Sequence, residues 1–231
     1  MKKKAREKKM KITFHVVTLF EGAFSSYLEA SILKRATERN IVTFRFYNPR
    51  DFTKDKWARV DRRPYGGGPG MVLEAESVLR AVQKAIGRKQ RSAVKVIIFE
   101  PGGEQFDTAY ADKVAKRYEH VVLICGRYEG VDARVKKILR AEPVTIGPYI
   151  LTGGELPALV VADTIARRVK GVLGNAESVE EMRIAAHDVY TRPETLLWKG
   201  KRYRVPEVLL SGNHKDIEVW KLEQHKKMKE K

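Results

Sequence analysis

Apolar runs rich in β-branched residues alternate along the chain with segments whose apolar residues recur every three or four positions. The first pattern predicts strands and the second predicts amphipathic helices. Strands are expected at residues 12–20, 42–47, 94–99, 121–126 and 144–146, and helices at 25–38, 74–86, 107–118, 131–139 and 155–169. Such an alternation is typical of an α/β layer structure.

Two of these helices carry boundary signals in the sequence. Asp107 is predicted to cap the helix at 107–118, because its carboxylate can accept a bond from a free N–H of the first turn. Pro157 falls in the first turn of the helix at 155–169, where its missing N–H is harmless. Gly171 and Gly174 are expected to end that helix.

The helical and strand patterns weaken after residue 174. An acidic stretch follows, then a short apolar segment at 205–210 and a helical pattern at 216–229 with Trp220 on its apolar side. Four regions are therefore expected. They are a basic, disordered N-terminal extension at 1–10, an α/β domain at 11–174, a mobile linker at 175–192 and a small, shortened helical domain at 193–231.

Positive charge dominates the composition of this 231-residue chain. Lys and Arg number 46 and Asp and Glu number 29, which leaves a formal net charge of +17. An excess of this size favours a polyanionic partner such as nucleic acid. The lysine-rich extension contributes part of it and has two interpretations, a solubilising tail or an arm that contacts phosphates.

Cysteine usage and the length of the apolar runs limit the compartment. Cys125 is the single cysteine, which excludes an intramolecular disulfide, and no CxxC or HExxH zinc spacing is present. The apolar run at 121–125 is far shorter than the roughly 20 residues of a membrane span. We expect a cytoplasmic protein with no membrane partner and no disulfide-linked partner.

Glycine is concentrated in loops that the pattern places between elements. The sequence PYGGGPGM at 64–71 excludes helix and strand and predicts a tight loop, although it is neither a P-loop nor a GxGxxG motif. Three further loops, at 100–103, 126–130 and 151–157, each follow a predicted strand. Since ligands bind at the carboxyl ends of parallel strands, these three loops could build one pocket. An ordinary strand-to-helix turn is an equal alternative for the first of them.

Four charged residues in or near these loops have two interpretations each. Glu129 and Glu155 either lie near a bound ligand or stabilise the first turn of a helix through its dipole. Arg167 and Arg168, late in the helix at 155–169, either bind an anion or stabilise the C-terminal end of the helix.

Seven segments, taken in order, resemble the bacterial tRNA (guanine-N1)-methyltransferases of the TrmD type. They lie at residues 48–53 (NPRDFT), 61–71, 125–130 (CGRYEG), 146–157, 171–174 (GVLG), 190–194 (YTRPE) and 208–214 (VLLSGNH). The resemblance implies an α/β fold of the SPOUT class with a C-terminal trefoil knot, a small C-terminal helical domain, and a homodimer. It also implies that tRNA is a partner.

By the same resemblance, S-adenosylmethionine is the cofactor and binds in the knot loops. The residues carried over for this role are Pro101, Gly126, Tyr128, Ile146, Gly147, Pro148, Tyr149, Ile150, Leu151, Gly153, Gly154 and Pro157. Those carried over for tRNA binding are Asp61, Tyr65, Gly66, Gly67, Gly68, Pro69, Gly70 and His214. No metal ligands are assigned, although the resemblance is compatible with a requirement for Mg²⁺.

The implied reaction methylates N1 of guanosine 37, directly 3′ of the anticodon. A base must remove the N1 proton, and negative charge then develops on O6 of the guanine. Arg167 matches the catalytic arginine and Glu129 a carboxylate of the pocket. The family's general base is an aspartate in an acidic stretch of the linker, where this chain reads VEEMRI (residues 179–184) and has no aspartate. Glu181 is therefore the first candidate, Glu180 the second, and Asp188 more remote.

Two alternatives to an active enzyme remain at this point. One is a catalytically weak paralogue that binds tRNA and S-adenosylmethionine, which the missing aspartate favours. The other is a basic RNA-binding module without a cofactor, which would leave the glycine-rich loops without a purpose.

Overall fold

A computed structural model describes residues 11–173 and 188–229 of the chain. The chain divides into two compact units, and the division falls after residue 174. The predicted N-terminal extension and the base candidates Glu180 and Glu181 lie outside the described residues.

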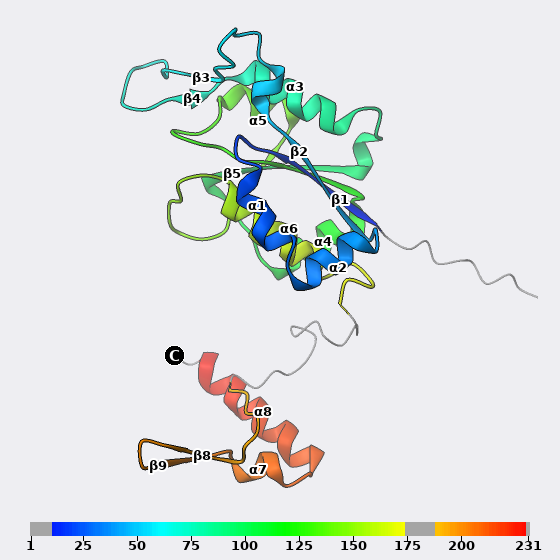
Figure 1. The fold of residues 1–231 in the computed structure, drawn as a ribbon, viewed down its shortest axis with the longest axis vertical. Coiled ribbons are helices and arrows are strands. Elements are labelled where there is room, and N and C mark those ends of the chain that lie inside the picture. The colour runs from blue at the N-terminus through cyan, green and yellow to red at the C-terminus, as the bar shows by residue number, and fades with distance from the viewer. Residues whose placement is uncertain (1–10, 174–187, 230–231) are drawn as a thin grey trace, which may run out of the picture. The chain divides into compact units, whose positions relative to one another are not determined.

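A parallel sheet of five strands forms the centre of the first unit (Figure 1). In the order β2-β1-β6-β5-β7, its strands are Val42–Tyr47, Ile12–Val17, His120–Ile124, Val94–Gln105 and Glu142–Thr145. All four pairings are parallel. The predicted α/β class is therefore confirmed, and the carboxyl ends of all five strands lie at one edge of the sheet.

Helices cover both faces of this sheet, as Figure 1 shows. One face packs against α1 (Gly22–Leu28), α2 (Ser31–Glu38), α4 (Thr108–Arg117) and α6 (Glu155–Ala166). The other packs against α3 (Ala75–Ile86) and α5 (Ala133–Leu139). Side chains of β1 alternate between the two layers, with Phe14 and Val16 in the first and Val17 in the second.

Shorter elements complete the first unit. They are the 3₁₀ turns η1 (Pro49–Phe52) and η2 (Arg91–Ala93), and the antiparallel pair of β3 (Asp61–Arg62) and β4 (Val72–Leu73). The glycine-rich loop at 64–71 therefore connects two paired strands.

The predicted helix at 25–38 is wrong in one respect, because the structure divides this region into α1 and α2. Phe24 and Leu33 are both buried against the same face of the sheet. Nine residues at about 100° each would place them on opposite sides of one straight helix. The break at Ala30, whose backbone is extended, allows both side chains to reach the core.

Helix α6 ends at Ala166, three residues before the predicted end and well before Gly171. The N–H groups of Arg168 and Val169 bond to carbonyls only three residues back, as in a 3₁₀-helix. The α-helix therefore ends in tighter turns and needs no glycine to stop it. The predicted N-cap of α4 is confirmed, since the Asp107 carboxylate accepts a hydrogen bond of 2.7 Å from the Tyr110 N–H.

Strand β5 runs on to Gln105, through the Pro-Gly-Gly sequence that could have been an ordinary turn. Phe99 and Glu104 both pair with Val144, so residues 100–103 bulge out of the strand between them. The turn alternative for residues 100–103 is therefore wrong.

The second unit contains a hairpin that the sequence interpretation missed. Strands β8 (Thr195–Trp198) and β9 (Lys201–Arg204) form this hairpin, and α7 (Glu207–Leu210) and α8 (His214–Lys229) follow it. The predicted helix at 216–229 is present as α8, and the short apolar segment at 205–210 contains α7. A purely helical description of residues 193–231 is incomplete. Within the described parts of both units, no helix is long and apolar enough to cross a bilayer.

Candidate functional site

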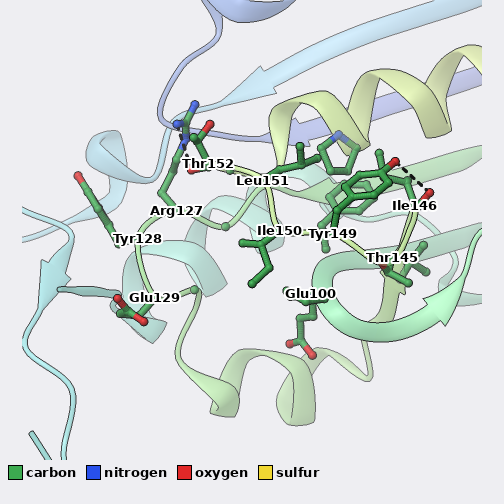
Figure 2. Close-up of a pocket in the computed structure, with 18 residues that line it drawn as sticks. Glu100, Arg127, Tyr128, Glu129, Thr145, Ile146, Tyr149, Ile150, Leu151 and Thr152 are labelled. Carbon is green, nitrogen blue, oxygen red and sulfur yellow. Dashed lines mark hydrogen bonds between the residues drawn. The ribbon is translucent and has the colours of Figure 1, made fainter. Parts of the chain in front are cut away.

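A cavity of about 270 Å³ lies beside the bulge of β5 and the carboxyl ends of β6 and β7. Its walls come from the bulge after Phe99, from residues 126–130 after β6, and from residues 145–154 after β7 (Figure 2). The sheet therefore assembles one pocket from the three loops that the sequence placed after strands.

Backbone contacts join the second and third loops directly. Arg127 and Gly153 form an antiparallel bridge, and the Gly154 N–H donates to the Gly126 carbonyl at 2.9 Å. The Arg127 guanidinium also donates to the Thr152 carbonyl at 3.3 Å, a bond drawn in Figure 2. These contacts hold the two loops against each other along one wall of the cavity.

Glycine is required where the loops approach most closely. A Cβ on Gly154 would lie 2.6 Å from Cα of Cys125, and one on Gly103 would lie 2.6 Å from the backbone carbon of Pro143. Both neighbours are backbone atoms, which cannot move aside as a side chain could. The glycines at these positions therefore permit loop packing that no other residue allows.

Glu155 is buried below the third loop and does not line the cavity. Its carboxylate accepts from the Thr18 hydroxyl at 2.8 Å and pairs with the Arg127 guanidinium at 3.0 Å. The same guanidinium lies over the Phe20 ring, 4.4 Å from its centroid. Glu155 thus anchors the loop after β6 through its ion pair with Arg127.

Mostly apolar side chains supply the wall formed by the loop after β7. Figure 2 shows Ile150 lying between Glu129 and Glu100, with Tyr149 on the side of Ile146. The Tyr149 hydroxyl donates to the Ile146 carbonyl at 3.3 Å, and its ring lies against Gly147. Ile150 is 84% exposed, so its apolar side chain is accessible to a ligand in the cavity.

Two carboxylates also line the cavity. Glu100 pairs with Lys136 of α5 at 2.7 Å, whereas no described residue forms an ion pair with Glu129. The Glu129 N–H donates to the Met71 carbonyl at 3.0 Å, which joins the cavity to the end of the glycine-rich loop. A carboxylate without a cation partner at this position is available to a ligand.

The glycine-rich loop reaches the cavity at Gly70. This residue has a φ of +88°, and a Cβ there would lie 2.6 Å from Oε1 of Glu129. Tyr65 is fully exposed, and the base of the loop is held by the pairing of Asp61 with Leu73. The positive φ angles that the glycine run permits are found at Gly66, Gly67, Gly68 and Gly70.

Comparison with known proteins identifies the family. A sequence model described as tRNA (Guanine-1)-methyltransferase TrmD matches residues 10–231. This chain belongs to that family. It is 43% identical to a tRNA (guanine-N(1)-)-methyltransferase of Dictyoglomus turgidum over 210 residues, which cover 89% of this chain and 82% of that protein.

A second relative and a solved structure agree with this assignment to the TrmD family. The relative, a protein of the same name from Clostridioides difficile, is 40% identical over 215 residues, which cover 91% of each protein. The crystal structure of a tRNA (m1G37) methyltransferase from Aquifex aeolicus matches with a TM-score of 0.75 and 38% identity. The match covers 93% of this chain and 89% of that one. The resemblance seen in the sequence is confirmed.

The structure gathers most residues that the TrmD resemblance assigned to the cofactor. Of those twelve residues, Gly147 and Pro148 alone are absent from the cavity lining, and Glu129 is present in it. Sequence reasoning did not select Phe99, Glu100, Arg127, Gly130, Val144, Thr145 and Thr152, which also line the cavity. Glu100 and Arg127 stood inside two of the predicted loops, so their position beside the selected residues was the available signal.

Arg167 does not lie at this cavity. It directly follows α6, whose first residue is beside the cavity, and 12 residues of helix separate the two Cα atoms by about 18 Å. Arg167 lies close to Asp163, and Tyr27 donates a hydrogen bond to that carboxylate. Burial raises the pKa of Asp163, while Arg167 and the bond from Tyr27 act in the opposite direction.

The other arginine and the remaining assigned residues have separate positions. Arg168 pairs with Asp112 at 2.6 Å and donates to the Thr164 carbonyl, so it joins α6 to α4. His214 begins α8 in the second unit.

The potential metal ligands and the single thiol are the remaining chemical groups. Within residues 11–173 and 188–229, no three His, Cys, Asp or Glu side chains gather as a metal site would need. Cys125 is buried, and its burial together with nearby Glu155 raises the pKa of the thiol well above its usual value. Its thiol therefore stays protonated and unreactive near neutral pH.

Proposed function

We propose that this chain transfers a methyl group from S-adenosylmethionine to N1 of guanosine 37 of tRNA, and that the cavity is its cofactor site. Membership of the TrmD family supports the reaction. The observation that carries the site is the convergence of residues assigned by resemblance on one cavity, beside the bulge of β5 and the carboxyl ends of β6 and β7. We do not retain the weak-paralogue alternative, because relatives over nine tenths of the chain are named as methyltransferases.

The residues around the cavity suit S-adenosylmethionine in both shape and charge. Ile150, Leu151 and Pro101 offer apolar contacts to an adenine ring, and the glycines bring backbone N–H and C=O groups within reach of its polar edge. Glu100 and Glu129 supply negative charge for ribose hydroxyls and for a cationic sulfonium. When bound, this cofactor supplies an electrophilic methyl group.

The proposal includes the trefoil knot of the SPOUT class. Three contacts support it, because they bind the segment after β7 to the segment after β6: the bridge of Arg127 with Gly153, the Gly154–Gly126 bond and the Arg127–Thr152 bond. A chain passed through a loop at this point would bring residues distant in sequence into one cofactor cradle.

The protein must perform two tasks at the guanine. One group accepts the proton of N1, and another stabilises the negative charge that develops on O6. The glutamate candidates Glu181, Glu180 and Glu129 can serve the first task, and Arg167 serves the second. Glu129 meets the glycine-rich loop at Gly70, so we assign that loop, with Tyr65 at its exposed side, to the tRNA.

Arg167 can reach a cavity only if a second copy of the chain supplies it. Leu156, Val160 and Arg167 share one face of α6 at spacings of four and seven residues, and Leu156 and Val160 are exposed. Tyr27 is an exposed aromatic residue of α1, and α1 packs on the same side of the sheet as α6. This is the kind of apolar face that a homodimer covers.

Two-fold symmetry then places the arginine. If two such faces pack about a two-fold axis with their α6 helices antiparallel, the end of one helix lies beside the start of the other. The start of α6 adjoins the cavity, and its end carries Arg167. We therefore propose that Arg167 of the second copy stabilises the negative charge on O6 of the guanine bound at the cavity of the first.

Methyl transfer to tRNA with guanosine at position 37 tests this function. We expect 1-methylguanosine at that position by mass spectrometry of the digested product, and none in tRNA carrying adenosine there. Comparing Glu181→Gln, Glu180→Gln, Glu129→Gln and Asp188→Asn in single turnover identifies the base, since its loss should slow transfer at least a hundredfold while tRNA binding persists. Absence of any methylated product from the natural chain would reject the proposed function.

Binding of S-adenosylmethionine tests the cavity separately. Ile150→Glu should weaken equilibrium binding at least tenfold, because it places a charge on the apolar wall that would contact the adenine. Ile138→Glu is the matched control, since Ile138 is also an exposed isoleucine but lies on α5, outside the cavity. Equal affinity in the two variants would place the cofactor elsewhere.

A further inference from the structure

The hairpin formed by β8 and β9 combines exposed apolar side chains with a high density of positive charge. Leu196, Leu197, Trp198 and Tyr203 are each more than half exposed. Residues 195–204 contain four cations, Lys199, Lys201, Arg202 and Arg204, and no acidic residue. Among the described residues, none of these four cations has an ion-pair partner.

The register of the hairpin sorts these side chains onto two faces. Leu196 pairs with Tyr203 and Trp198 with Lys201, so these four side chains share one face. Leu197 pairs with Arg202 and Thr195 with Arg204 on the opposite face. Lys199 and Gly200 form the turn, both with positive φ, as a tight two-residue hairpin requires. One face therefore carries both aromatic residues and one lysine, and the other carries two arginines.

Folding alone does not account for this composition. A two-stranded hairpin without a covering layer is marginally stable, and the packing within its own unit leaves both faces in water. A Trp and a Tyr on one open face cost solvation free energy unless a partner contacts them. The partner must also match four unpaired cations, which excludes a purely apolar surface.

Unpaired RNA satisfies both requirements at once. Its bases stack on aromatic side chains, and its phosphates attract Lys and Arg. We propose that the β8–β9 hairpin binds the tRNA substrate, with Trp198 and Tyr203 stacking on unpaired bases and the four cations contacting the adjoining phosphates. This inference rests on the proposed function for the identity of the RNA, and it adds a binding element outside the cofactor cavity.

Replacing the two aromatic residues tests the stacking. In the full-length protein, Trp198→Leu with Tyr203→Leu keeps apolar side chains but removes both rings. We expect the Kd and KM for tRNA to rise at least tenfold, while kcat at saturating tRNA and the affinity for S-adenosylmethionine stay unchanged. The control pair, Trp198→Phe with Tyr203→Phe, keeps both rings and should remain within threefold of the natural chain.

Replacing the cations tests their interaction with phosphates. Changing Lys199, Lys201, Arg202 and Arg204 to Gln should weaken tRNA binding and flatten its salt dependence. For every phosphate that is no longer neutralised, the slope of log K against log salt should fall by about 0.7 to 0.9. Thermal unfolding of each variant separates these effects from misfolding, and a variant that unfolds early is replaced by its single substitutions.

The outcomes separate this inference from the proposed function. If the natural chain methylates tRNA and every hairpin variant has the natural Kd, KM and salt slope, the hairpin inference is wrong and the function stands. If the leucine pair changes the sedimentation coefficient of the free protein and leaves tRNA affinity intact, the hairpin contacts a second copy and the RNA assignment is wrong. If the natural chain forms no 1-methylguanosine, the proposed function itself fails.

Discussion

Gly102 and Gly103 stand next to each other in the bulge of β5, but a side chain would meet different surroundings at each. A Cβ on Gly103 would lie 2.6 Å from the carbonyl carbon of Pro143 and 2.7 Å from that of Val144, whereas one on Gly102 has no neighbour within 4 Å. The two positions therefore separate the intrinsic effect of alanine from the effect of crowding β7.

We expect Gly103→Ala to destabilise the protein and Gly102→Ala to leave it nearly unchanged. Overpacking against backbone that cannot retreat costs about 1–3 kcal/mol. Urea unfolding followed by circular dichroism measures both variants against the natural chain. Equal stabilities would mean that the bulge is looser than its contacts with β7 indicate.

The buried side chain of His15 couples stability to pH. Its ring lies between Tyr47 of β2 and His120 of β6, with nitrogen contacts of 3.1 Å and 3.3 Å. Burial, and secondarily the charges of Lys89, His120 and Arg45, lowers the pKa of His15 from 6.5 to about 3. Burial also lowers the pKa of His120.

Because the pKa of His15 is lower in the folded state, the unfolded chain takes up a proton first as the pH falls. The free energy of unfolding should be independent of His15 above pH 6.5 and fall by up to about 1.4 kcal/mol per pH unit between pH 6.5 and about 3. In His15→Asn this contribution disappears. Urea unfolding should therefore show that the free energy of unfolding falls less steeply between pH 7 and 4 than in the natural chain. An unchanged slope would contradict it.

Among the elements, α6 depends on the ion pair at its first turn. Glu155 holds Arg127, which in turn bonds to the loop after β7 and covers Phe20. The helix, the strand end at Thr18 and two cavity loops are thus joined through one buried carboxylate. Its loss should affect both stability and cofactor binding.

Glu155→Gln should lower the free energy of unfolding by about 3–5 kcal/mol, since it leaves the partner charge of a buried pair uncompensated. The matched control is Glu76→Gln, which removes a carboxylate from an exposed pair with Arg80 on α3 and should leave stability unchanged. Thermal and urea unfolding measure both. If the two variants behave alike, the Arg127 pair does not anchor these loops.

For the whole molecule, the decisive question is whether each active site needs two chains. Arg167→Ala removes the arginine, and Ile150→Glu damages the cavity at the other end of α6. Each variant alone should have little activity in methyl transfer when the concentration of S-adenosylmethionine is well below the Kd of Ile150→Glu. After denaturation and joint refolding, half of the dimers contain one chain of each kind, and each of these has one complete site, so roughly a quarter of natural activity should return.

No recovery in such a mixture would mean that Arg167 acts within its own chain or not at all. Val160→Asp gives a second test of the dimer, because it places a charge on the exposed face of α6. We expect sedimentation to show that this variant is a monomer. Its methyl-transfer activity should be at least a hundredfold lower, while its binding of the cofactor stays normal. Full activity in a verified monomer would contradict the shared site.

Local pattern in the sequence was sufficient for the α/β class, for the strands Val42–Tyr47 and His120–Ile124 to within a residue or two, and for the cap at Asp107. The physical reason is that these features depend on neighbours close along the chain. Strands bury every second side chain and helices bury every third or fourth, so apolar residues recur along the sequence with those periods. A cap depends only on the first turn of its helix. The glycine-rich loops were likewise visible, because their backbone requirements exclude helix and strand.

Tertiary packing alone decided the rest. The pairing of Glu104 with Val144 carries β5 through a sequence that locally reads as a turn, and burial of both Phe24 and Leu33 divides one predicted helix into two. The partner of Glu155 is 28 residues back in the chain and its other contact, Thr18, is 137 residues away, so no local signal could distinguish an anchor from a ligand. Sequence determined which residues could form a site, and only the fold determined which of them meet.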